Sequence, residues 1–230
     1  FEDMVGQRIV TQALSNALSK GKIAPVYLFQ GSRGTGKTTA ARIFASALLC
    51  LSNGLQKPCG FCKECISVSQ SKCPEVREVD AASNNGIDRV KVLLEKTLSA
   101  NLSLYKVFII EECHVLTVET WNALLKILEE PPMNVVFILI TTDPDRLPRT
   151  VVSRCHKFLF PKIRDLEIVK RLQKLAALEK LAVDSETLQL IASRSDGSLR
   201  DAEITLDQVS LLGQQINSST VQELVLTLDL

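Results

Sequence analysis

Apolar side chains follow two different spacings along the first 160 residues. Over residues 5–20, Val10, Leu14, Ala17 and Leu18 recur on one face of a helix, and Gly21 supplies a stop. Helices are predicted at about 5–20, 37–50, 87–98 and 117–130. Strands are predicted at 26–30, 76–79, 106–114 and 135–140. This alternation indicates an α/β fold with a parallel sheet and flanking helices.

From residue 161 onward the strand pattern stops and only helical spacing remains. These helices are predicted at about 164–180, 184–194, 198–212 and 218–226. Gly197, Gly213 and Asn217 divide them. The change predicts two domains, an α/β domain over 1–160 and a small all-helical domain over 161–230, joined by a short hinge.

Composition narrows the classes of protein without choosing one. The chain has 230 residues, 46% of them hydrophobic, and a formal net charge of +1. That charge argues against a generally basic nucleic-acid coat but leaves open a ring of subunits that holds DNA. The sequence has neither a run of about 18 apolar residues nor a leader-like N-terminus, which predicts an intracellular protein with no membrane partner. Because the sequence starts at Phe1 and stops at Leu230, we expect a fragment of a longer chain.

A glycine-rich segment between the first predicted strand and the second predicted helix has the pattern of a phosphate-binding loop. Its backbone N–H groups and the following helix N-terminus would hold phosphates. In this pattern Lys37 reaches the terminal phosphates and Thr38 a magnesium ion. The alternative is a chance match, which the flanking strand and helix disfavour. The nucleotide-binding candidates are Gly31, Ser32, Arg33, Gly34, Thr35, Gly36, Lys37, Thr38 and Thr39.

Two acids follow the apolar run at residues 107–110. Hydrolysis of a nucleotide needs one carboxylate to hold magnesium through its water shell and another to orient the attacking water. Glu111 and Glu112 occupy those two places. Alone, such a pair is more often a solvated strand end, but the upstream phosphate loop favours the catalytic interpretation.

Four cysteines, Cys50, Cys59, Cys62 and Cys65, are separated by eight, two and two residues. In an intracellular, reducing compartment, cytoplasm or nucleus, this clustering favours a metal over disulfides. Four thiolates around tetrahedral zinc make a closed structural site, and we expect a zinc module over about 50–73. The alternative is four reduced, unliganded cysteines in a loop. The other three are interpreted as small apolar residues: Cys73, Cys113 and Cys155.

With these residues in hand, the sequence closely resembles the AAA+ ATPase region of the bacterial DNA polymerase III gamma/tau clamp-loader family, over essentially its whole length. The same motifs resemble the plant STICHEL family. The matching stretches are Val5-Gly6-Gln7, the phosphate loop, the four cysteines, Asp80-Ala81-Ala82-Ser83, Ala123-Leu124-Leu125-Lys126, Leu128-Glu129-Glu130-Pro131-Pro132, Thr141-Thr142-Asp143-Pro144, Ser153-Arg154-Cys155 and Gly197-Ser198-Leu199-Arg200-Asp201-Ala202.

The resemblance implies a helical lid at 161–230, ATP, Mg²⁺ and structural Zn²⁺ as cofactors, and Val5 among the nucleotide-binding residues. It also implies that Thr142 is the sensor-1 residue and Arg200 the sensor-2 arginine. Arg154 would be the arginine finger offered to a neighbouring subunit's ATP, the alternative being a surface salt bridge. The implied partners are homologous AAA+ subunits in a ring, a sliding clamp and primer-template DNA.

One departure bears on activity. Where the bacterial family has Asp before the catalytic Glu, this chain has Glu111, whose side chain is one methylene longer. The main hypothesis is a magnesium-dependent ATPase of clamp-loader type. The second is a STICHEL-like module that binds nucleotide for a structural or interaction role with little turnover. Another phosphate-loop enzyme, such as a small-molecule kinase, is a third, but the sequence offers no acceptor site.

Overall fold

A computed structural model describes residues 1, 3–52, 57–83, 88, 90, 92, 105–211 and 215–216. The chain forms two compact units. The first contains Ile9–Gly31 and Lys37–Phe160, and the second contains Asp3–Arg8, Ser32–Gly36 and the described residues from Pro161 onward. The phosphate-loop tip therefore groups with the C-terminal unit, while the residues on either side of it belong to the first. In the described part of the chain, no helix is both long and apolar enough to span a membrane.

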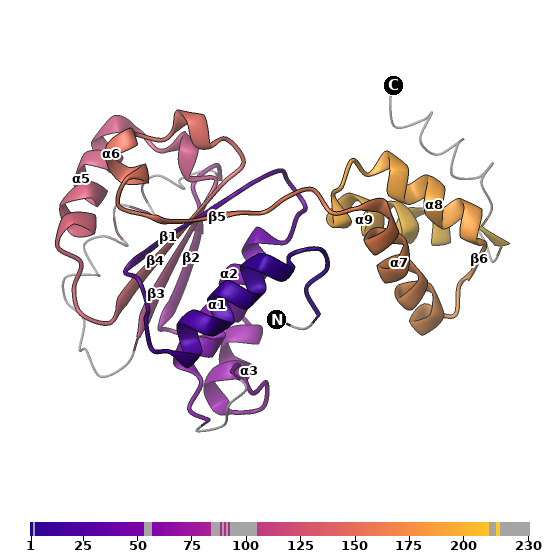
Figure 1. The fold of residues 1–230 in the computed structure, drawn as a ribbon, viewed down its shortest axis with the longest axis horizontal. Helices are drawn as coiled ribbons and strands as arrows, with labels where there is room; N and C mark the ends of the chain where they lie inside the picture. The colour runs from indigo at the N-terminus through magenta and orange to yellow at the C-terminus, as the bar shows by residue number, and fades with distance from the viewer. Residues whose placement is uncertain are drawn as a thin grey trace. The chain divides into compact units, whose positions relative to one another are not determined.

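The first unit is built on a five-stranded parallel sheet (Figure 1). Across the sheet the strand order is β2, β3, β4, β1, β5. The strands are β1 (Val26–Gln30), β2 (Val76–Asp80), β3 (Lys106–Glu111), β4 (Val135–Thr141) and β5 (His156–Leu159). Because the strands are parallel, their carboxyl ends, and the polar residues that follow, meet at one edge.

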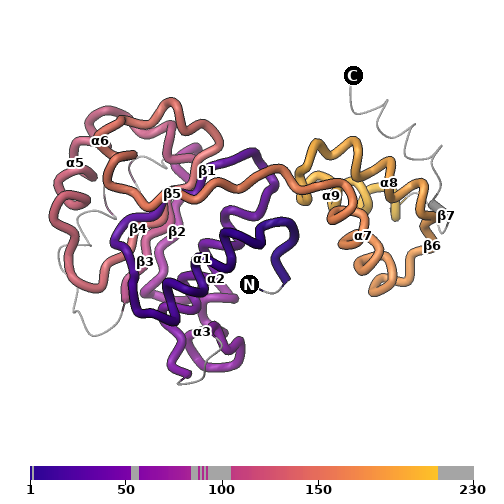
Figure 2. The backbone as a smooth tube through the Cα atoms, in the orientation of Figure 1, coloured from indigo at the N-terminus to yellow at the C-terminus, as the bar shows by residue number. Residues whose placement is uncertain are grey.

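Helices cover both faces of this sheet, with α1 and α2 on one side and α5 and α6 on the other (Figures 1 and 2). The helices of this unit are α1 (Arg8–Ser19), α2 (Lys37–Leu49), α3 (Lys63–Ser69), α5 (Val118–Glu129) and α6 (Arg149–Val152). Two short 3₁₀ turns, η1 (Cys113–Val115) and η2 (Pro144–Arg146), follow β3 and β4. This confirms the predicted α/β class with a parallel sheet.

Side chains alternate between the two covered faces, which explains the unbroken apolar runs in the central strands. Phe108 and Phe137 stack with ring centroids 5.3 Å apart, in a buried cluster that includes Trp121 of α5. On the other face, Tyr27 meets Phe44 of α2 edge to face at 4.9 Å. Burial on both faces fixes the strand positions and hence the residues at their ends.

The second unit packs three helices around its own apolar core. They are α7 (Asp165–Glu179), α8 (Ser185–Arg194) and α9 (Leu199–Ser210). Side-chain caps start two of them, because Asp184 accepts from the Thr187 N–H and Ser198 from the Asp201 N–H. The sequence pattern did not predict one minor feature of this helical unit, the parallel pairing of β6 (Ala182–Val183) with β7 (Gln215–Ile216). Two-residue strands are too short to leave a pattern in the sequence.

Three further differences concern the first unit. The strand predicted over 106–114 ends at Glu111, because Glu112 takes a left-handed conformation (φ 45°) and η1 follows. The spacing of Val118, Trp121, Leu125 and Leu128 predicts one apolar face for α5, and the buried face is shifted from it, since Val118 is 75% exposed whereas Leu124 is fully buried. Helix α3 was not predicted.

Some predicted elements fall largely outside the described residues. Of the helix predicted over 87–98, residues 88, 90 and 92 are described and are helical, and Val90 is fully buried. The helix predicted over 218–226 lies wholly outside them.

Candidate nucleotide site and cysteine cluster

The phosphate loop joins β1 to α2 through backbone that only glycine adopts easily. Gly31 has φ +146°, and a β-carbon there would lie 2.2 Å from the carbonyl oxygen of Phe160 on the neighbouring chain segment. Gly34 has φ +73°. Side chains at these positions would push the loop away from its neighbours, so the glycines allow the tight curl of backbone that phosphate-binding loops use.

Lys37 starts α2 and is nearly buried, with 6% of its surface exposed. Its Nζ donates to the carbonyl oxygen of Gly31 at 2.7 Å, which folds the ammonium back over the loop. Burial lowers the pKa of Lys37, and the charges of Glu112 and Glu111 partly oppose this. The lysine is therefore a desolvated cation at the loop, suited to a phosphate group.

Glu111 ends β3 and faces the start of α2, where the Thr38 hydroxyl hydrogen-bonds its carboxyl group. Burial raises the pKa of Glu111, the hydrogen bond from Thr38 opposes that rise, and the charge of Glu78 adds to it. Thr38 and Glu111 together present oxygen ligands beside the loop, and magnesium prefers oxygen ligands.

Glu112 is held by residues from the neighbouring strand. The Thr142 hydroxyl, just after β4, donates to Glu112 Oε2 at 2.9 Å. His114 Nδ1 lies 3.4 Å from the same oxygen and 3.0 Å from Thr141 Oγ1. The two residues assigned from the sequence as water-orienting acid and sensor are thus in direct contact. We call Lys37, Thr38, Glu111, Glu112 and Thr142 the strand-end group.

Sequence reasoning missed several residues around this group. His114 lies beside both Glu112 and Thr141, while Glu78 of β2 neighbours Glu111 and is paired with Arg42 of α2. His114 lies two residues after the acids and Thr141 next to Thr142, so proximity in the sequence was a usable signal. Arg42 and Glu78 had none, because only the sheet brings β2 beside β3.

The two arginine candidates, Arg154 and Arg200, belong to different units of the chain. Arg154 follows α6, and its guanidinium donates to the Thr150 carbonyl oxygen at 2.7 Å and to Glu129 Oε1 at 2.8 Å. Arg200 is exposed on the first turn of α9, in the second unit. The structure thus does not bring Arg154 to the strand-end group, and its described polar partners are Thr150 and Glu129.

The remaining candidates from the loop and its surroundings differ in how far they are exposed to solvent. Arg33 and Thr39 are exposed, whereas Thr35 is buried and its hydroxyl donates to the Ser32 carbonyl oxygen at 2.8 Å. Val5 packs against the apolar core of the second unit. Within that unit the N–H of Leu199 also donates to the Gly34 carbonyl oxygen at 3.1 Å, so the start of α9 meets the loop tip.

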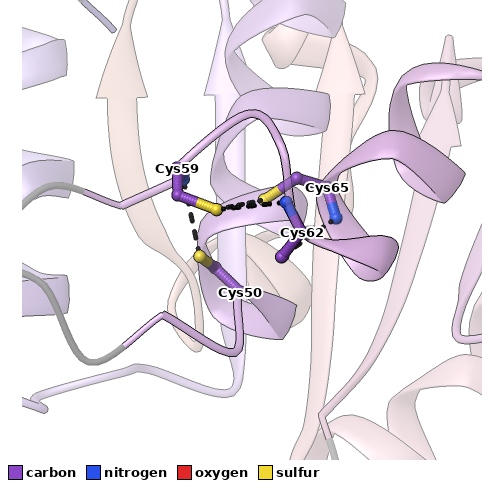
Figure 3. Close-up of side chains that lie close together, drawn as sticks. All are labelled: Cys50, Cys59, Cys62 and Cys65. Carbon is purple, nitrogen blue, oxygen red and sulfur yellow. Dashed lines mark hydrogen bonds between the residues drawn. The ribbon is translucent and has the colours of Figure 1, made fainter.

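The four predicted cysteines converge between the end of α2 and the start of α3 (Figure 3). We call Cys50, Cys59, Cys62 and Cys65 the cysteine cluster. All four sulfur atoms lie within 4.8 Å of one another, and those of Cys59 and Cys65 are 3.9 Å apart. No disulfide joins them. Zn–S bonds of about 2.3 Å in a tetrahedron place sulfurs roughly 3.8 Å apart, so the spacing suits a metal.

Backbone hydrogen bonds stabilise thiolates in this cluster. The N–H of Cys65 and that of Leu51 lower the pKa of Cys62 to about 6. Burial by itself would raise the pKa of Cys50. Hydrogen bonds from the N–H groups of Cys59 and Ser52 outweigh burial, so the pKa of Cys50 is lowered. Burial raises the pKa of Cys65 to about 11. The cluster thus combines thiolate-stabilising donors with one desolvated thiol that a metal would deprotonate.

The three other cysteines differ from the cluster. Cys73 and Cys113 are buried among apolar side chains, in two different clusters. Burial raises the pKa of Cys113 well above its usual range and that of Cys155 to about 11. Raised pKa values keep the thiols of Cys113 and Cys155 in the neutral form, which packs as a small apolar group.

The phosphate loop at the end of β1, the acids after β3 and the helical C-terminal unit define an AAA+ type ATPase fold. Known structures share this fold. The Thermotoga maritima RuvB Holliday junction branch migration motor superposes with a TM-score of 0.67 at 20% identity, covering 97% of this chain and 70% of that one. At this identity the likeness concerns the fold alone.

Sequence comparisons identify the family. Residues 6–164 match the profile described as "DNA polymerase III, delta subunit", and residues 167–219 match "DNA polymerase III clamp loader subunit, ATPase lid domain". Arabidopsis thaliana Protein STICHEL is 53% identical over 228 residues, 98% of this chain. The DNA polymerase III subunit tau of Bacillus subtilis is 46% identical over 209 residues, 90% of this chain. The chain belongs to the AAA+ clamp-loader family of DNA polymerase III gamma/tau subunits, whose relatives include the STICHEL proteins.

The chain spans only part of these relatives. It corresponds to 19% of the length of STICHEL and 37% of the Bacillus subtilis tau subunit.

Proposed function

We propose that this chain binds ATP with Mg²⁺ and hydrolyses it as the ATPase module of a gamma/tau-like clamp loader, with residues 1–160 as its nucleotide-binding domain and 161–230 as its lid. The observation that carries the proposal is the strand-end group, which gathers a buried lysine, a threonine, two acids and a second threonine from three chain segments. These are the groups that phosphoryl transfer requires, and they lie beside a phosphate loop.

Each residue of the group has a specific task in this scheme. Lys37 would neutralise the terminal phosphates, while Thr38 and Glu111 would hold the magnesium ion, which supplies charge neutralisation to the phosphates when bound. Glu112 would orient the attacking water, and the hydroxyl of Thr142 keeps its carboxylate in place at 2.9 Å. Thr142 thereby acts as the sensor expected from the family.

The proposal extends to neighbouring subunits. Arg154 is the arginine finger in this scheme, offered to the ATP of an adjacent AAA+ subunit, and its pairing with Glu129 holds the guanidinium until a phosphate competes for it. Arg200, exposed on α9, is the sensor-2 arginine. A ring of such subunits would engage a sliding clamp and primer-template DNA, as the family relationship suggests.

We further propose that the cysteine cluster holds structural Zn²⁺. Support comes from sulfur atoms within 4.8 Å of one another and from four protein ligands, which would leave no open position for chemistry. Thiol ligands of this kind persist in a reducing compartment, such as the cytoplasm or nucleus.

The second candidate is a STICHEL-like module that binds nucleotide without productive turnover. It is favoured by Glu111, which is one methylene longer than Asp and already hydrogen-bonded to Thr38, and by the 53% identity to STICHEL. In that case the nucleotide would set domain orientation or partner binding.

Binding and phosphate release, measured separately, distinguish these functions. Binding of a fluorescent ATP analogue should be lost in Lys37→Ala and retained in Glu112→Gln and Thr142→Val. Phosphate release, with and without sliding clamp and primed DNA, should fall by about 100-fold in Glu112→Gln, the usual contribution of a positioned base. Phosphate release by Thr142→Val should fall about 10-fold, since a hydrogen bond to a charged group contributes about 1.5–3 kcal/mol.

Lys170→Ala, at an exposed lysine of α7, is the matched control and should change neither quantity. Absence of ATP binding would overturn both candidates. ATP binding without phosphate release, in wild type and in Glu111→Asp alike, would reject the ATPase and support the STICHEL-like module.

A further inference from the structure

Arg42 and Glu78 form an ion pair next to the magnesium side of the strand-end group. Arg42 lies on α2, whose first residue is Lys37, and Glu78 lies in the middle of β2. Arg42 Nε donates to Glu78 Oε2 at 2.8 Å, and Nη2 donates to Oε1. This two-point contact fixes the plane of the carboxylate, which a single contact would leave free to turn.

The Glu78 carboxyl group also reaches Glu111. The Glu78 and Glu111 carboxyl groups are electrostatic neighbours, and Thr38 contacts the Glu111 carboxyl as well. The sheet register explains this contact, because Glu78 pairs with Ile109 and Glu111 lies two residues further along β3 on the same face. Such diagonal neighbours are within reach of long side chains.

The ion pair is a poor candidate for a purely stabilising feature. Its side chains are 50% and 30% exposed, and exposed pairs contribute about 0–1 kcal/mol. Its position is more informative, because two carboxyl groups side by side repel each other unless a cation neutralises one of them. Arg42 supplies that charge, and Glu78 can then stay next to Glu111.

The length of the Glu111 side chain makes such support useful. Glutamate has one more rotatable bond than aspartate, so its carboxyl group loses more freedom when it is held in one place. Thr38 contacts it from α2 and Glu78 from β2, which restricts the carboxyl group from two elements.

We propose that Glu78, held by Arg42, is a positioning residue that keeps the Glu111 carboxyl group oriented toward the magnesium ion of a bound nucleotide. The inference rests on the proposed ATP and magnesium binding. Residues that hold a metal ligand in place typically affect metal affinity about 10–100-fold when they are removed. Glu78 and Arg42 are therefore expected to set the magnesium requirement without touching the nucleotide.

The test is a magnesium titration of nucleotide binding, with Glu78→Ala, Glu78→Gln and Arg42→Ala compared with wild type. The half-saturating Mg²⁺ concentration for binding of a fluorescent ATP analogue should rise about 10-fold in Glu78→Ala and Arg42→Ala. Affinity for the analogue in the presence of EDTA should not change. The half-saturating Mg²⁺ concentration should rise less in Glu78→Gln, because the new amide N–H can donate to the Glu111 carboxylate and so restrain it.

Arg77→Ala is the matched control, because Arg77 is exposed on the same strand with its side chain on the opposite face. A second arm repeats Glu78→Ala in a Glu111→Asp background. Because the shorter acid does not reach Glu78, the shift there should fall to about twofold or less, the signature of direct coupling.

Equal shifts in the two backgrounds would overturn the inference, and so would a lowered melting temperature with an unchanged magnesium requirement, which marks a structural cross-link. If wild-type binding shows no magnesium dependence, the proposed function fails at that step and the inference falls with it. If wild type responds to magnesium and the variants respond identically, the inference alone is wrong.

Discussion

The cysteine cluster and the strand-end group are assembled in opposite ways. The cluster takes all four sulfurs from residues 50–65, and three of them accept hydrogen bonds from N–H groups within the same segment. The strand-end group takes its residues from the start of α2 and the ends of β3 and β4, which lie far apart in the chain. One site depends on local backbone geometry and the other on the register of a sheet.

This difference predicts separate vulnerabilities. A local site loses its structure when a ligand is removed, and the sheet has no reason to change with it. A site at strand ends tolerates changes in distant loops but responds to the core beneath the sheet, because the strands carry its residues.

The largest effect is expected from breaking the cysteine cluster. Cys65→Ser should abolish zinc binding, measured as metal content of the purified protein, and expose α3 to limited proteolysis. Structural zinc sites bind with about 10 kcal/mol or more of apparent free energy, so the loss exceeds any single contact. Binding of a fluorescent ATP analogue should persist, because the strand-end group takes no residue from this segment.

Cys155→Ser is the matched control, since Cys155 lies outside the cluster and should leave the zinc content unchanged. Full zinc occupancy in Cys65→Ser would contradict the four-ligand site.

A smaller effect is expected from the core beneath the sheet. Trp121→Ala, on the buried face of α5, should lower the free energy of unfolding by about 3–5 kcal/mol in urea denaturation. Val118→Ala on the same helix should change it by less than about 0.5 kcal/mol, because Val118 is 75% exposed. Equal costs would mean that α5 packs through the face predicted from the sequence rather than the observed one.

The smallest effect is expected at Arg154. Its ion pair with Glu129 is solvent-exposed, since 36% of the Arg154 side chain and 53% of the Glu129 side chain are accessible to water. Glu129→Gln should therefore change the free energy of unfolding by less than about 1 kcal/mol. Urea denaturation at low and high salt measures this, since screening should remove what difference there is. A loss of several kcal/mol would identify the pair as a structural element and weaken the arginine-finger assignment.

Much of the architecture was predictable from residue patterns. The runs at 26–30 and 135–140 became β1 and β4, and the helices at 164–180, 184–194 and 198–212 became α7, α8 and α9. The failures have physical causes. Val118 fits a helical apolar face by spacing alone, but which face is buried depends on the sheet, and the pairing of β6 with β7 involves residues more than thirty positions apart.

By itself the sequence determined the phosphate loop and the cysteine spacing, because both are short segments whose chemistry is carried by neighbouring residues. It also supplied the two acids after an apolar strand. Only the tertiary structure decided which side chains meet these acids. Thr142 donates to Glu112, and Glu78, which is paired with Arg42, lies beside Glu111. The physical reason is that parallel strands are joined by crossovers, so neighbours in the sheet are not neighbours in the chain, and strand order and register set every contact between their ends.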